Sequence, residues 1–184
     1  RYALENKKSL ADIAAFMQDS EKNYAVNHLI VFSDPVVSKV LENNISGIGT
    51  TGNRVQRALR TSDSRLNKGV SWGIPNAIAS VNSFLLYGNR DNHRNINYNT
   101  RRWKYIKQQL TGRKKPVTPE DMKSIMSYCN GTPSPFSNTK YLYNKATLYM
   151  VIFQPDTLEL EVYFFPRHTL NVPAKPVFER ISVF

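Results

Sequence analysis

The stretch "NHLIVFSDPVVSKVLENN" (residues 27–44) decides the fold class. Its first half is a short run rich in β-branched and aromatic residues, which ends at Ser33-Asp34-Pro35. Extended character returns five residues later with "SKVLENN". Because Ser, Asp and Pro favour turns, this pattern predicts a β-hairpin, and the chain therefore contains an antiparallel sheet near its N-terminal end.

A second hairpin is predicted near the other end of the chain. The stretch "ATLYMVIFQPDTLELEVYFFP" (residues 146–166) reads as two strands joined at Gln154-Pro155-Asp156-Thr157. The proline-containing tail from Arg167 onward is expected to be irregular. Hairpins at both ends argue against a parallel α/β fold and favour an α+β fold with mostly antiparallel sheets.

Three helices are expected, from apolar residues at helical spacing and from helix-start signals. They are predicted over roughly 10–19, over 100–110, and within 116–128. Their expected capping residues are Ser9 with Asp12, Asn99 or Thr100, and Thr118 before Pro119. No internal repeat or linker divides the chain, so residues 1–184 are expected to form one domain, or most of one.

Two further segments carry the functional question. Gly47 to Gly69 has no hydrophobic period and predicts an exposed loop. The nearly apolar "AIASVNSFLLYGN" (residues 77–89) predicts a buried strand with a single Asn82 inside it. Burying an asparagine costs free energy unless its amide is satisfied, so Asn82 either serves a function or is satisfied by backbone at a bulge.

Composition sets bounds on partners. The 25 Lys and Arg residues against 14 Asp and Glu give a net charge of +11. The denser basic clusters surround one predicted helix without a nucleic-acid-binding motif, so a solvated basic face is favoured over nucleic-acid binding. No apolar run is long enough to predict a membrane span. The compartment stays open.

The residues that usually carry catalysis are few and scattered. His28, His93 and His168 lie far apart and have no flanking signature, so they predict neither a Ser/His/Asp set nor a metal site. The single cysteine, Cys129, follows a predicted helix and is interpreted as a small buried apolar residue rather than a nucleophile.

The order of several segments adds a resemblance. "LENKKSLADIAAFM", the hairpin at 27–44, "IASVNSF", "NTRRW" and the hairpin that starts "YNKATLYMVIFQP" follow one another along the chain. Together they resemble the C-terminal portion of the choloylglycine hydrolase and penicillin V acylase family and its related acyltransferases, such as acyl-CoA:6-aminopenicillanic acid acyltransferase. These are N-terminal-nucleophile (Ntn) hydrolases of linear amide bonds. The matched positions are Asp34 with Glu42, Val81-Asn82, and Arg102-Trp103.

The resemblance, which covers most of residues 1 to about 165 through the order and spacing of short segments, implies a fold and a set of site residues. The fold is the four-layer α/β/β/α arrangement of Ntn hydrolases. Asn82 would donate to the oxyanion of the tetrahedral intermediate, and Arg102 would favour a thiolate and organise the site. The neighbouring Arg101 leaves the arginine register open by one residue. No cofactor and no metal are implied, and the candidates for shaping an acyl pocket are Trp72, Phe84 and Tyr87.

One departure from the family matters most. The family's nucleophile is an N-terminal cysteine whose own α-amine acts as base, whereas position 1 here is Arg1 and Cys129 lies downstream of both matched site residues. The resemblance therefore implies a partner segment or chain that carries the cysteine, as in an autoproteolytically processed heterodimer, and predicts that this chain alone is inactive. A fragment, or a chain that has lost catalysis, are the alternatives.

Two functions follow as expectations. The first is an amidase, completed by the missing segment, that hydrolyses a small-molecule N-acyl amide or transfers its acyl group. The second is a non-catalytic basic module that binds an anionic partner, whose affinity would fall steeply with salt. Hydrolysis versus transfer, the acyl and amine groups, and a homo-oligomeric state all stay open.

Overall fold

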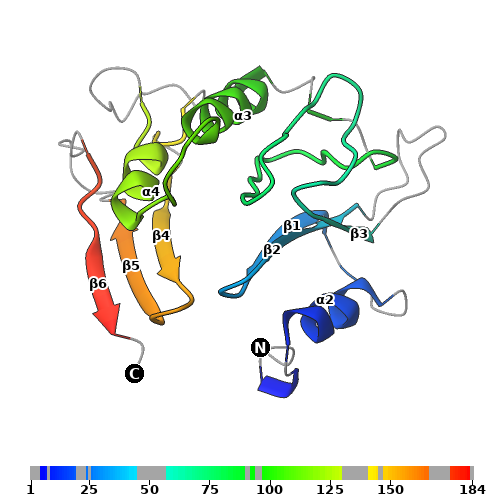
Figure 1. The fold of residues 1–184 in the computed structure, drawn as a ribbon, viewed down its shortest axis with the longest axis horizontal. Helices are drawn as coiled ribbons and strands as arrows, with labels where there is room; N and C mark the ends of the chain where they lie inside the picture. The colour runs from blue at the N-terminus through cyan, green and yellow to red at the C-terminus, as the bar shows by residue number, and fades with distance from the viewer. Residues whose placement is uncertain are drawn as a thin grey trace. The chain divides into compact units, whose positions relative to one another are not determined.

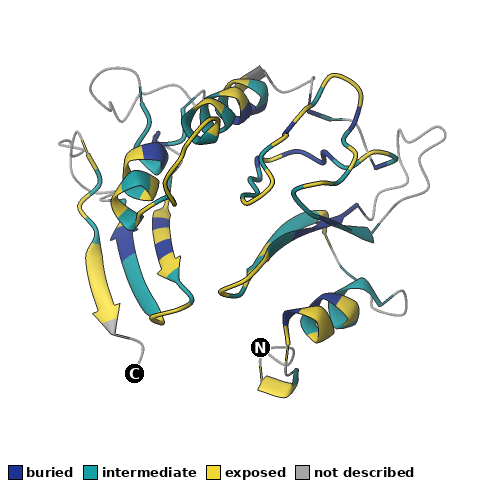
Figure 2. Ribbon diagram, in the orientation of Figure 1, coloured by how far each residue is buried: buried dark blue, intermediate teal, exposed yellow. Residues whose placement is uncertain are grey.

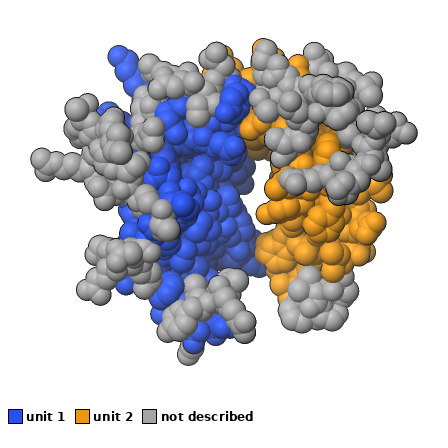
Figure 3. Space-filling model, turned by 180° about the vertical axis from the view of Figure 1, so that it is seen from behind, with its two compact units in different colours: residues 1–99 blue, residues 100–184 orange. Residues whose placement is uncertain are grey.

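The computed structural model combines helices with antiparallel sheets, so the predicted α+β class is confirmed (Figure 1). It divides into two compact units, residues 1–99 and residues 100–184, which Figure 3 distinguishes by colour. The residues that the structure describes are 5–7, 9–19, 24, 26–44, 57–89, 92–93, 97–129, 141–144, 147–165 and 175–182.

The first unit contains a three-stranded antiparallel sheet in the order β1-β2-β3. Its strands are β1 (His28–Ser33), β2 (Ser38–Asn43) and β3 (Arg57–Arg60). The predicted hairpin is confirmed, since β1 and β2 pair from His28 opposite Asn43 to Ser33 opposite Ser38. In Figure 2 part of β2 is dark blue, because the side chains from Val40 to Asn43 are buried.

The turn of this hairpin is closed by Asp34. Its carboxylate accepts hydrogen bonds from the backbone N–H groups of Val36 at 2.8 Å and Val37 at 2.7 Å. These bonds stabilise the ionised form, so they hold the pKa of Asp34 below its ordinary value. The aspartate expected at this turn therefore stabilises the turn, and the turn sets the register of the two strands.

Helix α2 (Leu10–Gln18) packs against this sheet and contacts all three strands. Its predicted cap is confirmed, since the Asp12 N–H donates to Ser9 Oγ at 3.1 Å and the Ser9 hydroxyl donates to Asp12. The helix lies on one side of the sheet, while the irregular segment 61–89 lies on the other (Figure 1). The central strand is therefore covered on both faces.

Two predictions for the first unit are wrong. The expected exposed loop from Gly47 to Gly69 contains strand β3, and Arg60 and Asn67 within it are buried; residues 47–56 lie outside the described residues. Segment 77–89 is irregular rather than a strand, apart from one isolated bridge between Leu66 and Leu86. Val81, Phe84 and Leu85 are nevertheless buried. Side chains rather than a strand ladder accept the backbone N–H groups of Phe84 and Leu85.

The second unit contains another three-stranded antiparallel sheet, in the order β4-β5-β6. The strands are β4 (Tyr149–Gln154), β5 (Glu159–Phe164) and β6 (Glu179–Ser182). The predicted C-terminal hairpin is confirmed. The tail, however, was expected to be irregular, and its residues 179–182 pair with β5 instead. Buried and exposed residues alternate along β4, which shows as bands in Figure 2.

Helices α3 (Asn97–Leu110) and α4 (Pro119–Met126) complete the elements that the structure describes in the second half of the chain. Helix α3 begins at Asn97, so neither Asn99 nor Thr100 caps it as predicted. Helix α4 starts with the predicted cap, in which the Thr118 hydroxyl and the Asp121 carboxylate each accept from the other residue's backbone N–H. It contacts β4.

The second unit has an aromatic core. Tyr143, Met150 and Tyr163 are buried together, and the hydroxyl groups of the two tyrosines lie 2.8 Å apart. Met126 from α4 and Cys129 pack against this cluster. Across the part of the chain that the structure describes, no helix combines the length and apolar character needed to cross a membrane.

Candidate functional site

Asn82 lies in a tight turn on the surface of the first unit rather than in a buried strand. The Ser83 N–H donates to Val81 O at 2.5 Å, a three-residue turn that places Asn82 at its centre with its side chain exposed. The desolvation cost expected for a buried asparagine therefore does not arise. Among the described residues the Asn82 carboxamide has no hydrogen-bond partner, so it is available to a ligand.

A cavity of about 350 Å³ opens beside this turn. Its described lining residues are Asn27, His28, Leu29, Asn82, Ser83, Phe84 and Asn92. They offer carboxamides, an imidazole, a hydroxyl, an aromatic ring and an alkyl side chain, but no lysine, arginine or carboxylate, although the whole chain carries a net charge of +11. Such a lining suits an uncharged polar ligand better than a phosphate.

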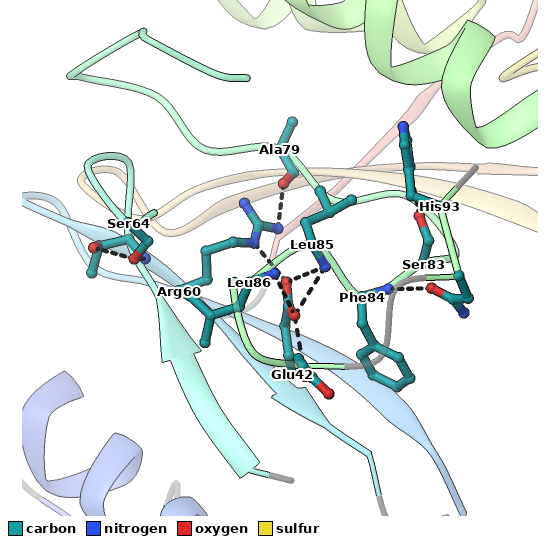
Figure 4. A network of polar contacts seen from close by, with 12 residues as sticks. Glu42, Arg60, Ser64, Ala79, Ser83, Phe84, Leu85, Leu86 and His93 are labelled. Atoms are coloured by element: carbon teal, nitrogen blue, oxygen red, sulfur yellow. Dashed lines mark hydrogen bonds and ion pairs between the residues drawn. The ribbon is translucent and has the colours of Figure 1, made fainter. Parts of the chain in front are cut away.

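Ser83 is hydrogen-bonded to a histidine next to this cavity. Its Oγ lies 2.9 Å from His93 Nδ1, and the two residues are 2% and 4% exposed. No sequence motif predicts this pair, because the two residues are ten positions apart and belong to no known pattern. This bond joins Ser83, the residue after Asn82, to His93, and Figure 4 shows the two side chains next to each other.

The segment that carries Asn82 is bonded to a buried carboxylate on β2. Glu42 accepts from Arg60 Nε at 2.8 Å and from the backbone N–H groups of Leu85 and Leu86, each with an oxygen 3.0 Å away. Asn89 Nδ2 also donates to it at 3.3 Å. Figure 4 shows these bonds converging on Glu42. The carboxylate is therefore extensively hydrogen-bonded, as a buried charge must be.

Arg60 on β3 bonds to a different part of the same segment. Its Nη2 donates to the backbone oxygen of Ala79 at 2.7 Å. Burial lowers the pKa of Arg60, and the neighbouring Glu42 carboxylate opposes that shift. The ion pair thus neutralises both buried charges while it contacts the segment on both sides of Asn82.

Of the three residues predicted to shape an acyl pocket, only Phe84 lines this cavity with Asn82. Phe84 is buried, and its N–H donates to Asn92 Oδ1 at 2.8 Å. Trp72 is buried elsewhere, with its indole N–H bonded to Ala77 O at 2.7 Å. Tyr87 is exposed and lies under the Arg65 guanidinium, 3.8 Å from the ring centre. Neither of these two lines the cavity, so they do not join this site.

Arg102 lies on α3 in the second unit. It is half-buried, and its Nε donates to the backbone oxygen of Tyr141 at 3.1 Å, whereas Arg101 is exposed. Of these two neighbouring arginines, Arg102 is thus the half-buried one, with a hydrogen bond to the backbone of Tyr141. Asn82 belongs to the first unit, and a joint role for Asn82 and Arg102 stays a prediction.

Cys129 is half-buried against the aromatic core of the second unit, and this burial raises the pKa of its thiol. A raised thiol pKa is the opposite of what an activated nucleophile needs. Within the described ranges, no group of three or more His, Cys, Asp or Glu side chains is arranged to hold a metal ion.

Comparisons with known proteins give no match. No protein-family model matches the chain, and neither the curated proteins nor the solved structures include a significant relative.

Proposed function

We propose that this chain is the C-terminal portion of an amidase that acts on linear N-acyl amide bonds, with Asn82 as a donor to the oxyanion. The observation that carries the proposal is the exposed Asn82 carboxamide, which has no partner among the described residues and lies on the wall of a cavity whose described lining residues carry no lysine, arginine or carboxylate. A donor held at such a site can stabilise charge that develops on a carbonyl oxygen.

The proposed chemistry is acyl transfer through a cysteine on another segment. The α-amine of the cysteine takes the proton of the thiol, and the resulting thiolate attacks the amide carbonyl carbon. The carbonyl oxygen becomes negative as the carbon turns tetrahedral. Asn82 Nδ2 donates a hydrogen bond to that oxygen. The amine then leaves with a proton delivered by the α-amine of the cysteine, and water or a second amine accepts the acyl group. Phe84 offers an apolar wall for the acyl chain.

Arg102 and the four-layer α/β/β/α fold belong to the same proposal. Arg102 would organise polar groups near the thiolate. In support of the fold, each unit has one helix packed on a three-stranded antiparallel sheet. On β4, the face opposite the buried Met150 and Ile152 carries the exposed apolar side chains of Tyr149, Val151 and Phe153. A second sheet would bury such a face.

The second candidate function, a basic module for an anionic partner, finds support in the net charge of +11. The absence of any cationic side chain among the cavity's described lining residues favours the amidase instead. The dependence on salt concentration distinguishes the amidase from the binding module. Phosphate contacts weaken steeply between about 50 and 200 mM salt, whereas KM for a neutral amide should change by less than about twofold.

The test uses the protein expressed from its full reading frame. Intact-mass spectrometry with N-terminal sequencing looks for an associated chain or segment that begins with cysteine. Hydrolysis of N-acetyl-, N-octanoyl- and N-phenylacetyl-p-nitroanilide is then followed at 50 and 200 mM salt. A cysteine-initiated partner with turnover insensitive to salt supports the proposal. No such cysteine and no turnover, together with salt-sensitive binding of a polyanion, would overturn it in favour of the binding module.

A further inference from the structure

We infer that the buried Glu42–Arg60 ion pair positions Asn82 for its role at the cavity. The two side chains tie down the chain on both sides of the Asn82 turn, at Ala79 and at Leu85. Each tether lies three residues from Asn82. This inference rests on the proposed function, because it assigns the pair a task in that same site.

The tethers come from two adjacent strands of one sheet. Glu42 is on β2 and Arg60 is on β3, where it pairs with Val40. The side chains of Glu42 and Arg60 are 0% and 1% exposed, and they are joined by the 2.8 Å bond from Arg60 Nε. The paired strands β2 and β3 fix the positions of the Glu42 and Arg60 Cα atoms. Hydrogen bonds from these two side chains therefore fix the position of segment 77–89, which forms no strand of its own.

A carboxylate suits this task for a specific chemical reason. The N–H groups of Leu85 and Leu86 point to one side of an irregular segment, and Glu42 accepts both. Bonds to an ionised acceptor are shorter and stronger than neutral ones. A third tether acts on the turn itself, since Asn99 Nδ2 donates to Asn82 O at 2.7 Å.

The pair acts through Asn82 rather than on a ligand. Neither Glu42 nor Arg60 is among the described residues that line the cavity. Both are therefore positioning residues. Displacement of a reacting group by about 1 Å can lower a rate by about a hundredfold, so a loosened turn should reduce turnover even in a folded protein.

A double-mutant cycle on the complete protein tests this inference, with N-phenylacetyl-p-nitroanilide as substrate. Glu42→Gln should lower kcat by about tenfold to a hundredfold. In the Asn82→Ala background the same substitution should change kcat by less than about twofold, because the group that it positions is gone. A general loss of stability would lower kcat equally in both backgrounds, and that result would overturn the inference.

Glu161→Gln provides the matched control. Glu161 is a partly buried carboxylate on β5 in the second unit, where it is paired with Lys123. The Glu161→Gln variant should have a kcat within about twofold of the wild-type value. Arg60→Lys is a milder second variant, because lysine keeps the charge but cannot bond to Glu42 and to Ala79 O at the same time. It should lower kcat in the same way as Glu42→Gln, but by a smaller factor.

Hydrogen exchange separates failure of the inference from failure of the proposed function. In Glu42→Gln, amide exchange over residues 79–86 should rise by more than about tenfold, while exchange over 149–164 stays unchanged. Unchanged exchange over 79–86 would overturn the tether, whatever the kinetics. Raised exchange with no effect of Asn82→Ala on kcat would keep the tether and remove the amidase assignment.

Discussion

Arg60 Nε lies 2.8 Å from Glu42 Oε1 in an ion pair that is almost completely buried. Removal of one member of such a pair leaves the other as an uncompensated buried charge, which typically costs about 3–5 kcal/mol. Arg60→Ala should therefore lower the free energy of unfolding by about this amount, measured by urea denaturation.

Arg113→Ala is the control for that measurement. Arg113 forms an ion pair with Asp121 at 2.9 Å, but both side chains are about one third exposed. Exposed pairs contribute about 0–1 kcal/mol, so this variant should remain close to wild type. Equal destabilisation by the two variants would contradict the special role assigned to the buried pair.

The cap of α4 gives a prediction confined to the second unit. Thr118 Oγ1 accepts from the Asp121 N–H at 3.1 Å. Thr118→Ala should cost about 0.5–2 kcal/mol of unfolding free energy, whereas Thr118→Ser keeps the hydroxyl and should cost much less. Circular dichroism during thermal unfolding measures both. A serine variant as unstable as the alanine variant would show that the methyl group, not the cap, matters.

The same cap should respond to acid. Hydrogen bonds from Thr118 and the nearby Arg113 lower the pKa of Asp121 below its ordinary value. The folded state therefore binds this proton less tightly than the unfolded chain does. The stabilisation is present above the unfolded pKa and is lost as the pH falls through the lowered folded pKa. Asp121→Asn should flatten the stability profile in that acidic window, and an unchanged profile would contradict the assignment.

Cys129 should react slowly. Burial raises the pKa of its thiol, so little thiolate is present at pH 7. Iodoacetamide should alkylate the folded protein more slowly than the urea-unfolded chain, and the rate should rise as the pH approaches the raised pKa. Rapid alkylation at pH 7 would instead identify an activated thiol. The shift also means that Cys129 contributes stability below the unfolded pKa, which is lost as the pH rises through the folded pKa.

Local chemistry explains which elements could be predicted from the sequence. The hairpin at 27–44 was identified from its own turn residues, and the caps at Ser9 and Thr118 bond to residues three positions away. These signals lie within a few residues of the structure they determine. They require no knowledge of the rest of the chain.

The incorrect predictions concern long-range contacts. Segment 77–89 has the apolar composition of a strand, but its backbone is bonded by Glu42, 43 positions from Leu85, and by Asn92. Strand β3, "RALR", has arginines at both ends, and the buried one, Arg60, is paired with Glu42 on the neighbouring strand. The Ser83–His93 bond likewise depends on the path of the chain between them. No pattern within a short window contains this information.

The structure places the site residues named from the sequence in different surroundings, and their roles stay predictions. Asn82 and Phe84 were named from the sequence and line one cavity, whereas Trp72 and Tyr87 do not line it. The expected burial of Asn82 in a strand is wrong, since its side chain is exposed at a turn. The contact of this amide with a ligand stays a prediction.

The most direct test of the central claim is the turnover of Asn82→Ala in the complete protein. Because Asn82 is exposed, the variant should unfold within about 0.5 kcal/mol of wild type. Loss of one oxyanion donor should lower kcat by about a hundredfold to a thousandfold on N-phenylacetyl-p-nitroanilide, with a much smaller change in KM. A folded variant with wild-type kcat would contradict the claim that Asn82 stabilises the oxyanion.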